Sequence, residues 1–131
     1  MSINENKAVV RQFIKKVLTD HDLDAVEKLV AANYVNRAIG NADLAGFKSM
    51  ISAMISAKLV SNIEIENLVA EGDSVVFRGK FKATTPDGKQ ATARGITYYR
   101  LANGKIVEDD PVFIPDLTQI FGTLMPPKSN P

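Results

Sequence analysis

The stretch that decides the fold of this chain reads Val75-Val76-Phe77-Arg78-Gly79-Lys80-Phe81-Lys82-Ala83. From residue 75 to residue 83 every second position is apolar or small, and the positions between them are mostly basic. A period of two predicts a β-strand with one face against a core and the other in water. A strand with one wet face is typical of an antiparallel sheet.

Turn signals on both sides extend this strand into a sheet. Glu71-Gly72-Asp73 separates it from an alternating run that starts at Ser61. Pro86-Asp87-Gly88 follows it, and Asn103-Gly104 is a strong hairpin signal further along the chain. Further strands are therefore predicted over residues 89–101 and 105–114. Because the turns are too short for a crossover, consecutive strands are expected to pair antiparallel.

The first half of the chain has a helical period instead. Ser2 and Glu5 fit a capping box, and a helix is expected from there to about Thr19–His21. Asp22 and Asp43 are each expected to cap a further helix. Apolar residues recur at helical spacing in all three segments: Val10, Phe13, Ile14 and Val17; then Leu23, Val26, Leu29 and Val30; then Leu44, Phe47, Ile51, Met54 and Ile55.

Helices followed by strands predict an α+β fold with the helices on one face of the sheet. A long, twisted sheet would curl around the N-terminal helices, so we expect a cavity between the sheet and the helices. The length of 131 residues predicts one domain, over residues 1–124, followed by a disordered tail at 125–131.

Composition excludes several classes of function. The formal net charge is +1, without the basic excess that binding to nucleic acid requires. With no Cys and one His, no thiolate chemistry and no metal site is expected. No stretch is long and apolar enough for a membrane span, and the polar start lacks the features of a signal peptide. We therefore expect a cytoplasmic protein that does not bind membranes.

Several short runs, in order and at matching spacing, resemble the SnoaL-like polyketide cyclase family of the nuclear transport factor 2-like superfamily. They are Asn6-Lys7-Ala8-Val9-Val10-Arg11-Gln12-Phe13, Asp22-Leu23-Asp24-Ala25, Asn33-Tyr34-Val35, Leu68-Val69-Ala70-Glu71-Gly72-Asp73-Ser74-Val75-Val76, Arg94-Gly95-Ile96, Asn103-Gly104-Lys105-Ile106-Val107-Glu108 and Asp116-Leu117-Thr118-Gln119-Ile120-Phe121-Gly122. The resemblance implies a cone with a hydrophobic pocket, a homodimer formed through the sheet, and ring closure by an intramolecular aldol reaction. That reaction uses a carboxylate acid/base and no cofactor.

The positions that carry chemistry in the family hold other residues here. Where the family has a His-Trp-Asp triplet after the last-strand Glu, this chain has Asp109, Asp110 and Pro111. Thr97 stands where a His is common, and Gly79 where a Trp is common. Loss of the indole at Gly79 would either enlarge the pocket or let another side chain fill it.

Asp109 and Asp110 are the candidate catalytic residues. Because side chains alternate along a strand, only one of the two acids can face the cavity. A two-residue turn at 103–104 would place Thr97 opposite Asp110, whereas a bulge would bring Asp109 or Pro111 to that face. The resemblance favours Asp109. An inward acid on an apolar wall would have a raised pKa and could act as acid or base; alternatively, both acids are solvated.

Arg94 could polarise a ligand carbonyl, or lie on the surface or at a dimer interface. Of Tyr98 and Tyr99 only one can face inward. The candidate substrate-binding residues are Phe13, Val17, Tyr34, Met50, Met54, Phe77, Gly79, Arg94, Thr97, Tyr99 and Phe113. Three functions remain open. The first is a cofactor-independent cyclase, isomerase or dehydratase of a small apolar carbonyl compound, and the second is a non-catalytic dimeric domain that binds a ligand or a protein. The third is a purely structural partner in a larger assembly.

Overall fold

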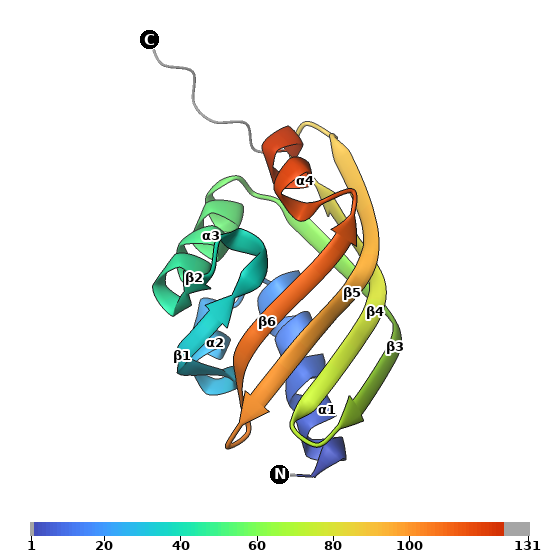
Figure 1. Cartoon of the computed structure of the whole chain (residues 1–131). Coiled ribbons are helices and arrows are strands. Elements are labelled where there is room, and N and C mark those ends of the chain that lie inside the picture. Colours follow the sequence, from blue (N-terminus) through green and yellow to red (C-terminus); the bar gives the residue numbers. More distant parts are fainter. Residues whose placement is uncertain (1, 125–131) are drawn as a thin grey trace.

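The computed structural model describes residues 2–124 and shows a curved six-stranded sheet with helices packed on its concave face (Figure 1). The strands are β1 (Val30–Asn36), β2 (Ala42–Asp43), β3 (Val60–Glu71), β4 (Ser74–Thr84), β5 (Gln90–Ala102) and β6 (Lys105–Ile114). The helices are α1 (Ile3–Gln12), the π-helix η1 (Phe13–Thr19), α2 (Leu23–Leu29), the 3-10 helix η2 (Arg37–Ile39), α3 (Leu44–Ser56) and α4 (Leu117–Leu124). The predicted α+β class is confirmed, whereas the predicted tail at 125–131 lies outside the described residues.

The starts of the helices follow the capping signals. Ser2 and Glu5 form the capping box that opens α1, and Asp22 accepts the backbone N–H groups of the first turn of α2. Asp43 caps α3 by accepting from the N–H of Gly46 at 2.9 Å. Each cap satisfies backbone donors that no helical carbonyl can reach. None of the described helices is long and apolar enough to cross a membrane.

The strand order β2-β1-β6-β5-β4-β3 contains the antiparallel ladder that the turn signals predict, from β3 to β6. The sheet is extended by β1, which pairs parallel with β6, so it is mixed and not wholly antiparallel as expected. Val30, expected on the second helix, instead begins β1. The sequence of β1 does not alternate cleanly, and its partner lies more than 70 residues away, so local pattern could not predict the pairing.

The β5–β6 hairpin decides which side chains face the helices. Asn103 and Gly104 both have positive φ, at 52° and 76°, as a tight two-residue hairpin turn requires. The register then shifts by one residue between Arg100 and Leu101. After this bulge Tyr99 pairs with Asp109, and Thr97 pairs with Pro111. The hairpin therefore has the predicted two-residue turn and, in addition, a bulge beyond it. Because of the bulge, Asp109 faces inward.

Two glycines lie side by side in the middle of the sheet, in a row that continues to Phe113. Gly79 of β4 pairs with Gly95 of β5, which pairs with Phe113 of β6. A Cβ at Gly79 would lie 2.0 Å from the carbonyl oxygen of Glu64, and one at Gly95 would lie 2.1 Å from that of Val112. Only glycine fits at such close approaches of neighbouring strands, and such glycines let a sheet curl.

We expect Gly79→Ala to destabilise the protein by about 1 to 3 kcal/mol, because the methyl group has no room beside a rigid backbone carbonyl. Urea unfolding monitored by circular dichroism measures the effect. Gly122→Ala in α4 is the control, because no heavy atom lies within 4 Å of its Cβ position. An equal stability loss in the two variants would contradict the role assigned to Gly79.

Candidate functional site

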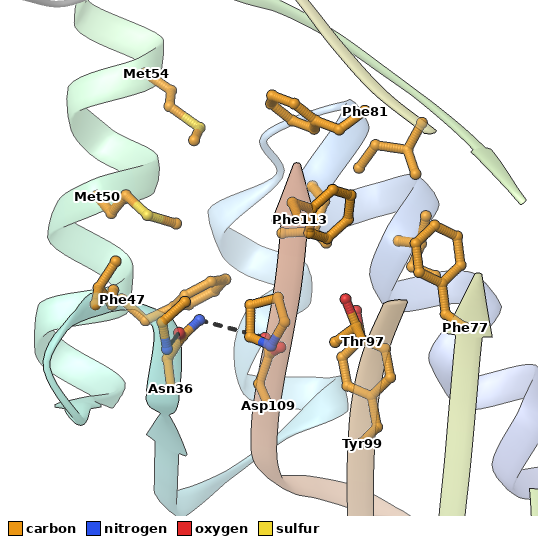
Figure 2. Close-up of a pocket in the computed structure, with 16 residues that line it drawn as sticks. Asn36, Phe47, Met50, Met54, Phe77, Phe81, Thr97, Tyr99, Asp109 and Phe113 are labelled. Carbon is orange, nitrogen blue, oxygen red and sulfur yellow. Dashed lines mark hydrogen bonds between the residues drawn. The ribbon is translucent and has the colours of Figure 1, made fainter. Parts of the chain in front are cut away.

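A cavity of about 70 Å³ lies between the concave face of the sheet and the segments η1, η2 and α3 (Figure 2). This is well below the roughly 300 Å³ at which typical ligand pockets begin. The walls are almost entirely apolar, with a few polar groups on one side. The lining residues are Ile14, Leu18, Asn36, Ala38, Ile39, Phe47, Met50, Met54, Ile63, Phe77, Phe81, Thr97, Tyr99, Asp109, Pro111 and Phe113.

The polar side of the cavity is centred on the carboxylate of Asp109, which is 3% exposed. The Tyr34 hydroxyl donates to Asp109 Oδ2 at 2.8 Å, and Asn36 Nδ2 lies 3.4 Å from the same oxygen. Asn36 Nδ2 also donates to the Tyr34 hydroxyl at 3.0 Å. These three residues form one hydrogen-bonded cluster, and β1 supplies both partners of the β6 acid.

The orientation of the Asn36 amide follows from its other end. Asn36 Oδ1 accepts the backbone N–H of Ala38 at 2.9 Å, as an Asx turn that opens η2. The oxygen is therefore committed to the backbone, and the NH₂ group points at the cavity cluster (Figure 2). Asn36 is thus held as a donor toward Asp109.

Burial dominates the acid–base properties of the cluster. Burial raises the pKa of Asp109 to about 7, partly opposed by the Tyr34 hydrogen bond and reinforced by the nearby charge of Asp110. Burial also raises the pKa values of Tyr34 and Tyr99 well above the ordinary tyrosine value, and the charge of Asp109 adds to both shifts. At neutral pH the site therefore holds neutral phenols beside a carboxyl group that can either take or give a proton.

Seven of the residues singled out in the sequence come together around this cavity: Met50, Met54, Phe77, Thr97, Tyr99, Asp109 and Phe113. Phe13, Val17 and Tyr34 are fully buried beneath it without lining it. Tyr34 reaches the site through its hydroxyl group, whereas Phe13 packs on Phe47 and Tyr99 with ring centroids 5.8 Å apart in each pair.

Asp110 and Arg94 do not face the cavity, and Gly79 does not line it. Asp110 pairs with Tyr98 and points away, because it follows the inward Asp109 on the same strand. Arg94 is exposed, and it lines a shallow hollow on the outer face of the sheet together with Gly79. The Phe77 ring fills the space beside Gly79: its Cζ atom would lie 2.6 Å from a Cβ there. Of the two alternatives for Gly79, the filled one is observed.

Asn36 is not among the site residues predicted from the sequence. The family resemblance did point to this place, since it puts Asn36 or Arg37 where a His is frequent shortly after Tyr34-Val35. Asn36 shares strand parity with Tyr34, but because β1 was not predicted, this parity could not be used to choose between the two. The other lining residues not singled out as site residues are Ile14, Leu18, Ala38, Ile39, Phe47, Ile63, Phe81 and Pro111. Among the residues that the structure describes, no cluster of His, Cys, Asp and Glu could hold a metal ion.

Comparison with known proteins identifies the family to which this cone-shaped α+β fold belongs. Residues 10–109 match the SnoaL-like domain, and the chain belongs to this family. No curated protein matches the sequence.

Solved structures share the fold at low sequence identity. AclR, a candidate hydroxylase from Streptomyces galilaeus, is 21% identical with a TM-score of 0.72, and the match covers 99% of this chain and 91% of AclR. A candidate polyketide cyclase from Acidithiobacillus ferrooxidans is 23% identical (TM-score 0.69, covering 91% and 96%). An epoxide hydrolase of the LEH-like type from M. tuberculosis is 15% identical (TM-score 0.71, covering 95% and 98%). These names span several reactions, so the shared fold leaves the chemistry open.

The raised pKa of Asp109 predicts a pH-dependent stability. The unfolded chain releases this proton near its ordinary value of 3.8, whereas the folded protein holds it up to about 7. Stability therefore falls as the pH rises from about 4 to 7, and the cost is complete above pH 7. We expect Asp109→Asn to be more stable than the wild type at pH 8 to 9 by about 2 to 4 kcal/mol, and similar to it near pH 4.

Thermal and urea unfolding across this pH range measure the difference. Asp110→Asn, on the opposite face of the same strand, is the matched control. A stability gain for Asp109→Asn that does not change with pH would contradict the prediction.

Proposed function

We propose that this SnoaL-like protein is a cofactor-independent enzyme that moves a proton at the carbon beside a carbonyl group of a small apolar compound. Asp109 is its acid and base. The observation that carries the proposal is the Asp109 carboxyl group itself. It lies buried on an apolar cavity, is held by Tyr34 and Asn36, and has a pKa of about 7.

A carboxyl group with this pKa suits proton transfer near neutral pH, because both of its protonation states are populated. As a carboxylate, Asp109 removes the proton from the carbon and leaves an enolate. The same group then returns the proton. Return to a different carbon gives isomerisation, and attack of the enolate on a second carbonyl of the same molecule gives ring closure.

The enolate oxygen needs a hydrogen-bond donor. Thr97 is buried on the cavity wall, and its hydroxyl group is a neutral donor there. We assign this role to Thr97 in place of Arg94, which lies on the outer face, whereas Asn36 keeps its NH₂ group on Tyr34 and Asp109. Fixed donors in a water-poor cavity stabilise developing charge more strongly than donors in water.

Proton shuttling fits the site better than hydrolysis does. Hydrolytic ring opening needs one group to activate water and a second to protonate the leaving oxygen. Among the described residues that line the cavity, Asp109 is the only carboxylic acid, and none is Lys, Arg or His. Tyr34 is a poor proton donor, because burial raises its pKa. One shuttling carboxyl group is sufficient for isomerisation or aldol closure.

A non-catalytic ligand-binding domain is the second candidate. It is favoured by the almost entirely apolar lining of the cavity, in which Asp109 is the one carboxylic acid among the described lining residues. In that case Asp109 serves to orient a polar atom of the ligand, and no proton is transferred to carbon.

Exchange of α-protons separates these functions. In D₂O we expect the wild type to accelerate deuteration of small cyclic ketones, measured by ¹H NMR, with a rate that rises with pH and levels off above about 7. Asp109→Asn should lower the rate by about 100-fold or more. Asp110→Asn is the matched control and should keep the rate within a few-fold, because it removes only the smallest of the three contributions to the pKa of Asp109. No acceleration across the ketone panel, or equal rates for the two variants, would refute the enzymatic proposal.

We also propose that two copies of the chain associate through the outer face of the sheet. Ile96, Val112 and Ile114 are 49%, 68% and 75% exposed, and Ile96 pairs with Val112. Arg94 and Glu66 line the same hollow. In a two-fold symmetric dimer the same patch of both copies meets. The apolar centres then pack on each other, and the Arg94 of one copy can pair with the Glu66 of the other.

Val112→Glu should convert this dimer into a monomer, because it places an acid at the centre of the patch. Analytical ultracentrifugation measures the change. Val60→Glu is the control. Val60 is 66% exposed, but it lies at the start of β3 and does not line the hollow. A monomeric wild type would overturn the proposal.

A further inference from the structure

The cavity is small because aromatic rings from the sheet occupy most of the space under the helices. Phe77 and Phe81 project from β4, and Phe113 projects from β6 (Figure 2). An apolar cavity known to hold one benzene molecule has a volume of about 150 Å³. At about 70 Å³, the cavity is too small for one aromatic ring. A ring-sized ligand therefore requires one of these side chains to move.

The two glycines of the central row give these rings their place. A Cβ at Gly79 would lie 2.6 Å from Phe77 Cζ, and a Cβ at Gly95 would lie 2.9 Å from Phe113 Cγ. Each phenyl ring thus lies directly over a backbone without a side chain. A ring over glycine is not locked by a neighbouring side chain beneath it.

The two rings differ in their freedom to move. Phe77 is 2% exposed and belongs to the buried core, whereas Phe113 is only partly buried. Phe113 also lies one residue before the end of β6. Figure 2 shows Met50 and Met54 reaching from α3 into the space that Phe113 borders. Methionine side chains are flexible and repack easily. Of the two rings, Phe113 is therefore the one that can move to enlarge the cavity.

We propose that Phe113 is the specificity-determining residue of this cavity and limits its ligands to about one ring. This inference rests on the proposed role of the cavity as the ligand site. Displacement of the Phe113 ring toward solvent opens room for a single ring beside Asp109. A second fused ring would need, in addition, the space that the displaced Phe113 ring still occupies at the edge of the cavity.

The test compares two ketone probes, cyclohexanone with one ring and 2-tetralone with two fused rings. Dissociation constants are measured by ligand-observed NMR for the wild type, Phe113→Ala and Phe113→Leu. Val69→Ala is the control, since Val69 is 57% exposed on β3 and lines neither the cavity nor the outer hollow. We expect the wild type to prefer cyclohexanone. Phe113→Ala should reverse this preference by raising affinity for 2-tetralone at least tenfold, with Phe113→Leu in between and Val69→Ala unchanged.

An unchanged ratio of the two dissociation constants in both Phe113 variants would overturn the inference, as would binding of neither ketone by any variant. If Phe113→Ala fails to fold, the ratio in Phe113→Leu decides. α-Deuteration of the same probes is recorded in parallel. A reversed binding preference without any deuteration would refute the proposed enzymatic function and still support the role of Phe113.

Discussion

The burial of the Asp109 carboxyl group is the constraint on which the rest of the site depends. A buried carboxyl group is costly unless donors surround it. Both donors come from β1, whose residue Asn36 pairs directly with Asp109 in the parallel β1–β6 ladder. The parallel pairing of β1 with β6 therefore also supplies the hydrogen bonds that lower the cost of burying Asp109. The remaining electrostatic cost appears as the raised pKa, which is the property that suits the group to proton transfer.

The shape of the cavity depends on a second constraint, the close approach of strands at Gly79 and Gly95. These glycines let the sheet curl over the helices, and they leave room for Phe77 and Phe113 to lie across the concave face. The two glycines thus create space on the concave face, and the rings of Phe77 and Phe113 fill most of it. Compared with a sheet that carries a large side chain at Gly79, this arrangement moves control of the cavity size to the neighbouring phenylalanines.

Much of the fold could be predicted because its signals are local. The caps at Ser2, Asp22 and Asp43, the alternation of residues 75–83 and the turn at 103–104 each act within a few residues. The same alternation predicts that Phe77 faces inward, whereas Thr97 was a candidate through the family resemblance. Asn36 was not selected because β1 is recognisable only through its distant partner β6. Arg94 was selected for its side-chain type, although it lies three residues before Thr97 and therefore on the opposite face of the same strand.

The sequence by itself determined the α+β class, the helical first half followed by antiparallel strands from Ser61 onward, and the adjacent acids Asp109 and Asp110 as candidates for the site. Alternation guaranteed that at most one of the two could face the helices. The tertiary structure decided that Asp109 does, because a bulge at Val107 of β6 shifts the register between Arg100 and Leu101 and turns Asp109 inward. It also decided that the cavity stays narrow. Both outcomes depend on how strands far apart in sequence approach one another, a distance that no local pattern encodes.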